Sequence, residues 1–280
     1  MIEKISDNFA VVKRGAWTLY LNRGYSAALL DAGIADPELL VKNGISVADS
    51  GRSKAVLFGF SEGKGVLREL RHGGMFRALT GGVFLSKKRP LCELDVHEYA
   101  GKCGVNVPEP LAACVRRAGL GFRAYIAMRF IENAVELAAC FTREADMRFS
   151  EKKSVIAACG REVRRMHDAG ILHADLHVRN ILVRRGKKPE AFIVDFDKAV
   201  LKKSVVSGDR EKNLLRLGRS VDKLPADERP NAADMLRFLV AYLDAGEPLD
   251  FDMRKFARKF SAHRRLHAAS RKLPGQKERL

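Results

Sequence analysis

The sequence predicts an α+β fold in two lobes, a small antiparallel sheet followed by a mostly helical part. Two observations carry this prediction. The first half is rich in glycine and in short apolar runs separated by turn residues, which is typical of strands. In the second half, apolar residues recur at helical spacing. Strands first and helices later indicate two separately packed lobes, with the boundary between residues 129 and 132.

In the first lobe, expected over residues 1–129, three apolar runs predict an antiparallel meander. Turn compositions separate these runs, which span residues 45–48, 55–60 and 65–70. One helix is expected over residues 91–102, because Gly104 and two prolines follow it. Two further strands, over residues 111–116 and 124–131, complete the expected sheet.

The second lobe is expected over residues 130–249. It begins with a helix over residues 151–169, in which Val155, Cys159 and Val163 share one face. Two short apolar strands and two further helices are expected after it, over residues 181–183, 191–194, 208–221 and 231–243. The residues that lead into the two strands are polar, and they hold the candidate chemistry.

The composition limits the function. The 280 residues carry 51 Lys and Arg against 34 Asp and Glu, a formal net charge of +17. Hydrophobic residues make up 46% of the chain, which is enough for a packed core and excludes wholesale disorder. The charge predicts attraction to an anionic partner: nucleic acid, nucleotide, phosphorylated glycolipid or a membrane surface.

The five cysteines are odd in number, far apart and without a C-x-x-C pair. This argues against a disulfide scaffold and a zinc ribbon, and favours small, buried, reduced thiols. The N-terminus lacks a basic region followed by an apolar one, and no apolar run approaches the roughly 18–20 residues that span a bilayer. We therefore expect a cytosolic protein that meets any membrane from outside the hydrocarbon.

The most informative segment runs from His173 to Asp197, where polar residues stand among apolar ones. Asp175 and Asn180 lie on the loop that enters one predicted strand, and Asp195 follows the end of the next. Side chains that emerge from paired buried strands into one loop region are expected to converge. Carboxylate and amide oxygens grouped in this way suit Mg²⁺, which prefers hard oxygen ligands.

The order His-x-Asp-Leu-x-x-x-Asn, followed by Asp-Phe-Asp with fourteen residues between Asn180 and Asp195, resembles the catalytic and metal-binding loops of the protein-kinase-like fold. Either motif alone is common, but both in this order and context are hard to obtain by chance. The resemblance implies that Asp175 is the base that accepts the proton of the acceptor hydroxyl. It also implies that Asn180 and Asp195 hold Mg²⁺ on the nucleotide phosphates, while His173 braces the loop.

A kinase-like fold also needs a basic residue on the third strand and a glutamate on the following helix. Arg68 and Glu93 occupy these places. Taken alone, an exposed strand charge and a solvated helix face are simpler accounts, but the neighbouring motifs reverse that preference, so we expect an ion pair that positions phosphate. The glycine-rich loop of kinases is poorly matched, since residues 50–54 contain a single glycine. These residues could cover phosphates through their backbone N–H groups, and a plain turn is an equally good account.

Longer matches narrow the resemblance. They are the helix around Glu93 and residues 66–75, 104–110, 167–183, 193–198 and 213–221. In these segments the chain is similar to the lipopolysaccharide kinase family, in particular its 3-deoxy-D-manno-octulosonic acid (Kdo) kinases. The Arg at position 68 and the Asp-Phe-Asp motif are traits of that family.

This resemblance implies an ATP- and Mg²⁺-dependent kinase that phosphorylates a sugar hydroxyl of the lipopolysaccharide inner core, Kdo on Kdo-lipid A. It also implies a peripheral protein on the cytoplasmic face of the inner membrane. His177 departs from the family, in which Asn is common, so the acceptor contacts at that position are open. The first fifty and the last thirty residues have no match.

The C-terminal segment, residues 250–280, is strongly basic. It has ten Lys and Arg against three acids, so +7 of the net charge lies in 31 residues. Phe251, Phe256 and Phe260 are interleaved with these cations, which allows a basic amphipathic helix on an anionic membrane surface. A solvated, partly frayed terminal helix is an equal alternative.

Three other functional classes stay open. A kinase of this fold could phosphorylate another acceptor, such as heptose, a small molecule or protein serine. A pseudokinase could bind nucleotide without catalysis, although Asp175, Asn180 and Asp195 argue against it. A nucleic-acid-binding protein would explain the charge, but the sequence contains no recognition module and no aromatic stacking platform, so no nucleic acid partner is expected.

Overall fold

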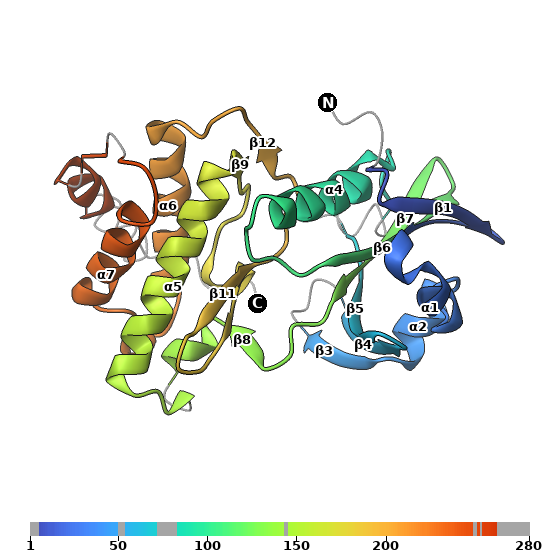
Figure 1. The fold of residues 1–280 in the computed structure, drawn as a ribbon, viewed down its shortest axis with the longest axis horizontal. Helices are drawn as coiled ribbons and strands as arrows, with labels where there is room; N and C mark the ends of the chain where they lie inside the picture. The colour runs from blue at the N-terminus through green and yellow to red at the C-terminus, as the bar shows by residue number, and fades with distance from the viewer. Residues whose placement is uncertain are drawn as a thin grey trace, which may run out of the picture. The chain divides into compact units, whose positions relative to one another are not determined.

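The computed structural model describes residues 6–49, 54–71, 83–142, 145–248, 251–252 and 254–261. The chain divides into two compact units (Figure 1). Unit 1 comprises Met1–Glu132 and Asp195–Ala199, and unit 2 comprises Asn133–Val194 and Val200–Leu280. The short segment Asp195–Ala199 therefore packs with unit 1, although the chain on both sides of it packs with unit 2.

Unit 1 is built on a seven-stranded antiparallel sheet with the order β1-β2-β6-β7-β5-β4-β3. Its strands are β1 (Phe9–Arg14), β2 (Trp17–Asn22), β3 (Ile45–Asp49), β4 (Lys54–Phe60), β5 (Gly63–Glu69), β6 (Pro110–Ala118) and β7 (Gly121–Arg129). Its helices are α1 (Ser26–Asp31), α2 (Pro37–Asn43) and α4 (Lys88–Lys102). The predicted meander is confirmed, because β4 pairs in antiparallel fashion with both β3 and β5.

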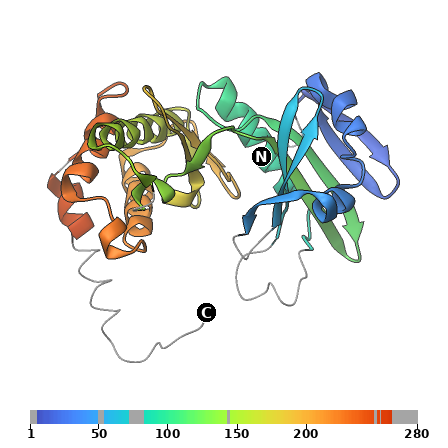
Figure 2. The same ribbon diagram turned by 90° about the horizontal axis from the view of Figure 1, so that it is seen from below.

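Both faces of this sheet are covered, because side chains alternate between them along each strand. Leu19, Leu67 and Tyr125 belong to one core, to which α1 and α2 contribute apolar residues. Tyr20 and Ile126 belong to a second core on the opposite face, together with residues of α4. Figures 1 and 2 give two views of the helices on this sheet. The alternation also places the Arg68 side chain opposite that of Leu67, on the face that α4 covers.

Unit 1 is larger than the sequence predicted. Strands β1 and β2 and helices α1 and α2 come from the first fifty residues, for which no elements were expected. The two strands form a hairpin around Gly15, whose φ of +54° is unfavourable for other residues. The expected lobe with a single helix is therefore corrected to one with three helices among the described residues. The alternating residues on either side of Gly15 were the available signal.

Unit 2 is mostly helical, as predicted. Its helices are α5 (Phe149–Asp168), α6 (Ser207–Val221) and α7 (Ala232–Leu243). Its short strands are β8 (Ala134–Glu136), β9 (Ile171–Leu172), β10 (Ile181–Arg184), β11 (Glu190–Ile193) and β12 (Val200–Leu201). β10 lies between β11 and β8 in one sheet, and β12 pairs with β9 in another. The predicted helices and the β10–β11 pair are confirmed within a few residues.

Helix α5 is the centre of unit 2. Its apolar positions, among them Val155, Cys159 and Val163, are fully buried. Gly160 lets α7 approach closely, since a Cβ at that position would lie only 2.4 Å from the carbonyl oxygen of Phe238. Helix α7 begins with a capping box between Asn231 and Asp234.

The start of the basic C-terminal segment packs against unit 2. Residues 254–261 are helical, and Phe256 is only 4% exposed. Phe260 lies against Gly218 of α6, where a Cβ would meet its ring at 2.1 Å. Phe256 therefore packs within unit 2 and does not face a lipid surface, while membrane association of the basic segment stays a prediction. Residues 262–280 lie outside the described residues.

All five cysteines are free thiols. Three of them are buried, as expected, while Cys103 is exposed and Cys92 is half-buried. Among the helices of the described residues, none is both long enough and apolar enough to span a bilayer.

Candidate active site

The first part of the candidate site is the loop between β9 and β10 in unit 2. His173 stands at its start, is almost completely buried and is hydrogen-bonded through both ring nitrogens. Its Nδ1 accepts the backbone N–H of Asp175 at 3.0 Å, and its Nε2 donates to the carbonyl oxygen of Val194 at 3.1 Å. This side chain therefore ties the loop to the end of β11, which agrees with the bracing role expected from the sequence.

Asn180 closes the same loop from its other end. Its Nδ2 donates to the backbone carbonyl of Asp175 at 3.0 Å. The backbone carbonyl oxygen of Asn180 accepts a hydrogen bond from the N–H of Val194, the residue before Asp195, at 3.0 Å. Asn180 thus fixes the backbone of Asp175 through its side chain and the end of β11 through its own backbone carbonyl. The Asn180 Oδ1, the atom that a metal ion would use, takes no part in these bonds.

The carboxylate of Asp175 contrasts with its fixed backbone. The side chain is 59% exposed, and its two nitrogen-bearing neighbours lie at loose distances. Arg216 Nη1 of α6 is 3.7 Å from Oδ1, and His177 Nε2 is 3.5 Å from Oδ2. Since His177 Nδ1 accepts the N–H of Arg179, the neutral ring carries its proton on Nε2, toward Asp175. A rigid backbone with an accessible carboxylate is what a general base requires.

A buried polar network supports this loop from behind. Asn213 Nδ2 of α6 donates to the carbonyl of His173 at 2.7 Å. The Oδ1 of the same side chain accepts from His167 Nε2 at 3.0 Å, and His167 Nδ1 accepts the hydroxyl proton of Tyr242 at 2.8 Å. Both ring nitrogens of a neutral His167 are therefore satisfied, and α5, α6 and α7 together hold the loop in place.

This network predicts acid sensitivity. Burial lowers the pKa of His167 to about 4, and the charge of Arg210 adds to the effect, although Asn213 and Asp168 oppose it. Between pH 6.5 and 4 the unfolded chain binds a proton at this histidine that the folded protein excludes. The free energy of unfolding therefore decreases by about 3 kcal/mol as the pH falls through this window.

Urea unfolding between pH 4 and 7.5 tests this expectation. His167→Gln should unfold with a flatter dependence of the unfolding free energy on pH than the wild type, whatever its absolute stability. Equal slopes for the two proteins would contradict the assignment of a neutral, buried histidine.

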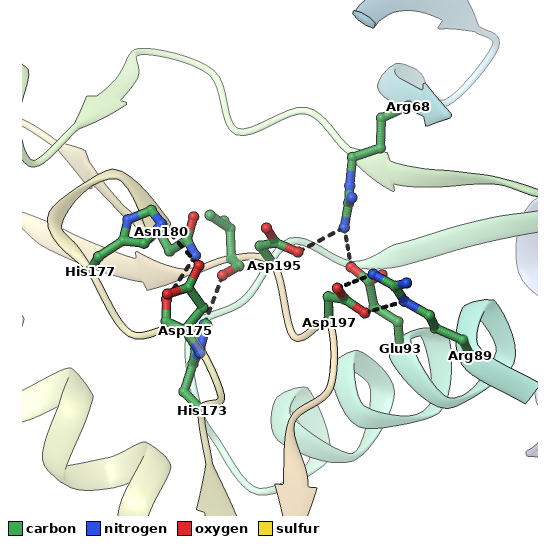
Figure 3. Close-up of polar contacts among 10 residues, drawn as sticks. Arg68, Arg89, Glu93, His173, Asp175, His177, Asn180, Asp195 and Asp197 are labelled. Atoms are coloured by element: carbon green, nitrogen blue, oxygen red, sulfur yellow. Dashed lines mark hydrogen bonds and ion pairs between the residues drawn. The ribbon is translucent and has the colours of Figure 1, made fainter. Parts of the chain in front are cut away.

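The second part of the candidate site lies in unit 1 (Figure 3). Arg68 on β5 forms a hydrogen-bonded ion pair with Glu93 of α4, and its Nη2 also lies 3.1 Å from Oδ1 of Asp195. Glu93 is 2% exposed, and its Oε2 is buried without a hydrogen-bond partner among the described residues. The pair predicted from the sequence is confirmed in position, and Asp195 joins it.

The charged groups around Arg68 shift one another's pKa values. Burial raises the pKa of Glu93 to about 7, assisted by the neighbouring charges of Asp195 and Asp197, whereas Arg68 acts in the opposite direction. Burial opposes the charge of Arg68, but Glu93, Asp195 and Asp197 outweigh it and raise its pKa above the usual value. Arg68 is therefore a permanent cation that holds the carboxylates of Glu93 and Asp195 together.

The segment after β11 carries Asp195 in a left-handed backbone conformation, with φ +65°, and Lys198 follows with φ +61°. Such values are unfavourable for residues other than glycine and are tolerated best by Asn and Asp, so contacts must impose them. Phe196 is buried edge-on against His97 at 4.8 Å between ring centroids. Asp197 accepts two hydrogen bonds from Arg89 of α4, with Nε to Oδ1 at 2.6 Å.

The sequence did not assign roles to Arg89, Asp197, Asn213 or Arg216. The signal for Arg89 was its spacing, because residues 89, 93 and 97 share one face of a helix. The contact of Arg216 with Asp175 crosses between two elements and left no local signal. The proposed phosphate-covering loop, residues 50–54, falls almost entirely outside the described residues.

The described ranges contain no group of three or more His, Cys, Asp or Glu that could hold a metal ion. A magnesium ion in a nucleotide site, however, uses one or two protein oxygens and completes its shell with phosphates and water. The side chains expected from the sequence, the amide of Asn180 in unit 2 and the carboxylate of Asp195 in unit 1, are donors of this kind, and the Asp195 side chain is 41% exposed. The donors are hard oxygens, which suit Mg²⁺ rather than Zn²⁺ or copper.

Comparisons with known proteins place these residues in a family. The family model described as Lipopolysaccharide kinase (Kdo/WaaP) family matches residues 41–242. A 3-deoxy-D-manno-octulosonic acid kinase of Xanthomonas campestris pv. campestris (strain B100) is 34% identical over 214 residues, which cover 72% of this chain and 82% of that protein. The enzyme of the same name from Vibrio cholerae serotype O1 is 32% identical over 195 residues, covering 67% and 78%.

A solved structure, WaaP in complex with acyl carrier protein, has the same fold. Its TM-score is 0.59 at 18% sequence identity, and the match covers 90% of this chain and 98% of that one. The two-lobed α+β, kinase-like fold expected from the sequence is therefore confirmed. Together with the family model, which covers most of the chain and both parts of the candidate site, these likenesses show that the protein belongs to the lipopolysaccharide kinase (Kdo/WaaP) family.

Proposed function

We propose that this protein transfers the γ-phosphoryl group of ATP to a hydroxyl of 3-deoxy-D-manno-octulosonic acid in the lipopolysaccharide inner core. The observation that carries the proposal is the loop around Asp175. Its backbone is fixed by His173 and Asn180, while its carboxylate stays exposed. The names of the relatives support this choice of acceptor, because they are kinases of that sugar acid.

In the proposed reaction, Asp175 accepts the proton of the acceptor hydroxyl as its oxygen forms a bond to the γ-phosphorus. The bond between that phosphorus and the β,γ-bridging oxygen breaks, and ADP leaves. Little covalent chemistry is asked of the protein in such a transfer, so positioning and charge neutralisation dominate. The fixed backbone of Asp175 serves this purpose, because it removes the conformational freedom of the base before substrate arrives.

Asn180 and Asp195 are the proposed ligands of Mg²⁺, and the ion when bound would neutralise charge on the nucleotide phosphates. Arg68 is the proposed phosphate-positioning cation, and Glu93 keeps its guanidinium in place. The planar guanidinium can make two parallel hydrogen bonds to phosphate oxygens, which an ammonium cannot do. Glu93 is buried, so its role in this proposal is to orient Arg68 and not to touch the nucleotide.

The charge of the chain fits the proposed acceptor. A net charge of +17 favours a phosphorylated, acidic glycolipid and the anionic surface in which it is embedded. Since such an acceptor resides in a membrane, the proposal includes peripheral association with the cytoplasmic face of the inner membrane. Arg216, a cation, and His177, a hydrogen-bond donor, flank Asp175 and are well placed to meet an acidic group of the acceptor.

The test is a phosphorylation assay with purified full-length protein, Mg·ATP and Kdo-lipid A. We expect a product one phosphate heavier than the acceptor by mass spectrometry, with the phosphate on the Kdo residue. Lipid A without Kdo, a heptose-containing core, an aminoglycoside and a serine peptide serve as comparison acceptors. Phosphorylation of one of these instead of Kdo would overturn the proposed acceptor, and nucleotide binding without any transfer would identify a pseudokinase.

A further inference from the structure

Helix α4 presents three polar or aromatic side chains at positions i, i+4 and i+8: Arg89, Glu93 and His97. Each contacts the segment Asp195–Ala199 directly or through one residue. Figure 3 shows the contacts of Arg89 and Glu93. Glu93 acts through Arg68 on Asp195, and His97 packs on Phe196. Arg89 makes the remaining contact, a two-bond ion pair with Asp197.

We propose that the Arg89–Asp197 ion pair holds the backbone of this segment and thereby positions Asp195, the proposed metal ligand. This inference rests on the proposed function, because it concerns the same nucleotide and metal site. It adds two residues whose role is separate from those of Arg68 and Glu93. Neither Arg89 nor Asp197 is placed on the substrate; both act through the backbone of the segment that carries Asp195.

The geometry supports a strong pair. The Nε and Nη2 atoms of Arg89 bind the two oxygens of Asp197, so the guanidinium and the carboxylate form a bidentate pair. Both side chains are largely shielded, at 20% and 24% exposure, and the guanidinium also lies 4.8 Å from the ring centroid of Phe84. A shielded bidentate pair loses little to solvent screening, unlike an exposed one.

The segment Asp195–Ala199 needs contacts that hold its backbone conformation. Its two left-handed residues, Asp195 and Lys198, cost free energy unless contacts hold them. The Ala199 N–H donates to the Phe196 carbonyl at 3.0 Å and closes a tight turn around Asp197. In the Asp-Phe-Gly form of this motif, position 197 would have no side chain, and Arg89 would have no partner. The third-position aspartate therefore gives the loop an attachment to α4 that glycine cannot supply.

The first test uses the protein without nucleotide. Hydrogen–deuterium exchange of peptides that cover residues 195–199 should be faster in Arg89→Gln and in Asp197→Asn than in the wild type. The control is Arg116→Gln. Arg116, on β6 of the same unit, bonds Glu38 at 2.6 Å and lies 4.8 Å from the ring centroid of Trp17, so it too combines an ion pair with an aromatic contact. Exchange of the segment in this control should equal that of the wild type.

The second test is the Mg²⁺ dependence of ATP binding by calorimetry, followed by the Mg²⁺ requirement of the kinase reaction. Arg89→Gln and Asp197→Asn should each need 10- to 100-fold more Mg²⁺, as expected for partners that orient a metal ligand. The double variant should be no worse than either single variant, because one shared interaction is lost. A reversed pair, Arg89→Asp with Asp197→Arg, should recover part of the lost Mg²⁺ affinity.

The outcomes separate the inference from the function on which it rests. If the wild type phosphorylates its acceptor but Arg89→Gln behaves like Arg116→Gln in both tests, the positioning role is wrong and the proposed function stands. If the wild type transfers no phosphate while exchange still rises only in the Arg89 and Asp197 variants, the attachment of the segment is confirmed and the proposed function is wrong. Additive losses in the double variant would show that the two residues act independently.

Discussion

Replacing Asp175 by asparagine is expected to lower kcat by about 10²- to 10⁴-fold, the contribution of a positioned general base. Asparagine has the same shape but does not accept the proton of the acceptor hydroxyl. The fold should persist, because the hydrogen bonds that hold residue 175 use its backbone N–H and carbonyl and not its carboxylate. The measurement is phosphate transfer to Kdo-lipid A at saturating ATP, together with the thermal unfolding midpoint.

The control is Glu190→Gln, which removes another half-exposed, ion-paired carboxylate in the same unit, bonded to Arg184 at 2.9 Å. This variant should retain wild-type turnover. The KM for ATP should change little in Asp175→Asn, since the nucleotide contacts are assigned to other residues. Turnover like that of the wild type would exclude Asp175 as the base, and a lost unfolding transition would show that its carboxylate is structural.

Replacing Asp195 by asparagine is expected to remove the effect of Mg²⁺ on nucleotide binding and to lower kcat at least about a hundredfold. Asparagine is the suitable substitution, because position 195 has φ +65°, which Asn tolerates and Ala does not. The amide keeps an oxygen but no charge, so it binds Mg²⁺ less strongly. Calorimetric titration of ATP with and without Mg²⁺ provides the measurement.

The contact of Asp195 with Arg68 gives a second way in which Asp195→Asn could weaken nucleotide binding, and a control separates the two. Asp195 also pairs with Arg68, so its loss could disturb the arginine instead of the metal. Binding of ATP without Mg²⁺ distinguishes the two, because it should survive if Arg68 still meets the phosphates. An Asp195→Asn protein whose ATP affinity rises with Mg²⁺ as in the wild type would show that Asp195 is not a metal ligand.

Elements with a regular pattern were predictable from the sequence. Helices α5 and α6 have apolar residues at helical spacing, and β4 and β5 are bounded by turn residues, so their positions are right within a few residues. Strands β1 and β2 were missed although they alternate, because the sequence around Gly15 matched no known motif. The short strands β9 and β12 have two residues each, which is below what any pattern can indicate.

The candidate site was only partly predictable. Asp175, Asn180 and Asp195 follow from the order and spacing of local motifs, since a loop between two paired strands keeps its residues near one another. The Arg68–Glu93 pair needed the kinase resemblance as a guide, because 25 residues separate its members. The Arg89–Asp197 pair, whose members are 108 positions apart in the sequence, had no such guide.

The sequence by itself determined the family, the two-part α+β plan and the candidate residues of the site, because these depend on local order, composition and periodicity. Only the tertiary structure decided which charges meet. It joined Asp195 to Arg68 and Asp197 to Arg89, set Arg216 beside Asp175, and buried Phe256 against unit 2. The physical reason is that an ion pair or a packed ring depends on strand register and helix rotation. Those are fixed by the cores on both faces of the sheet and around α5, which no local pattern records.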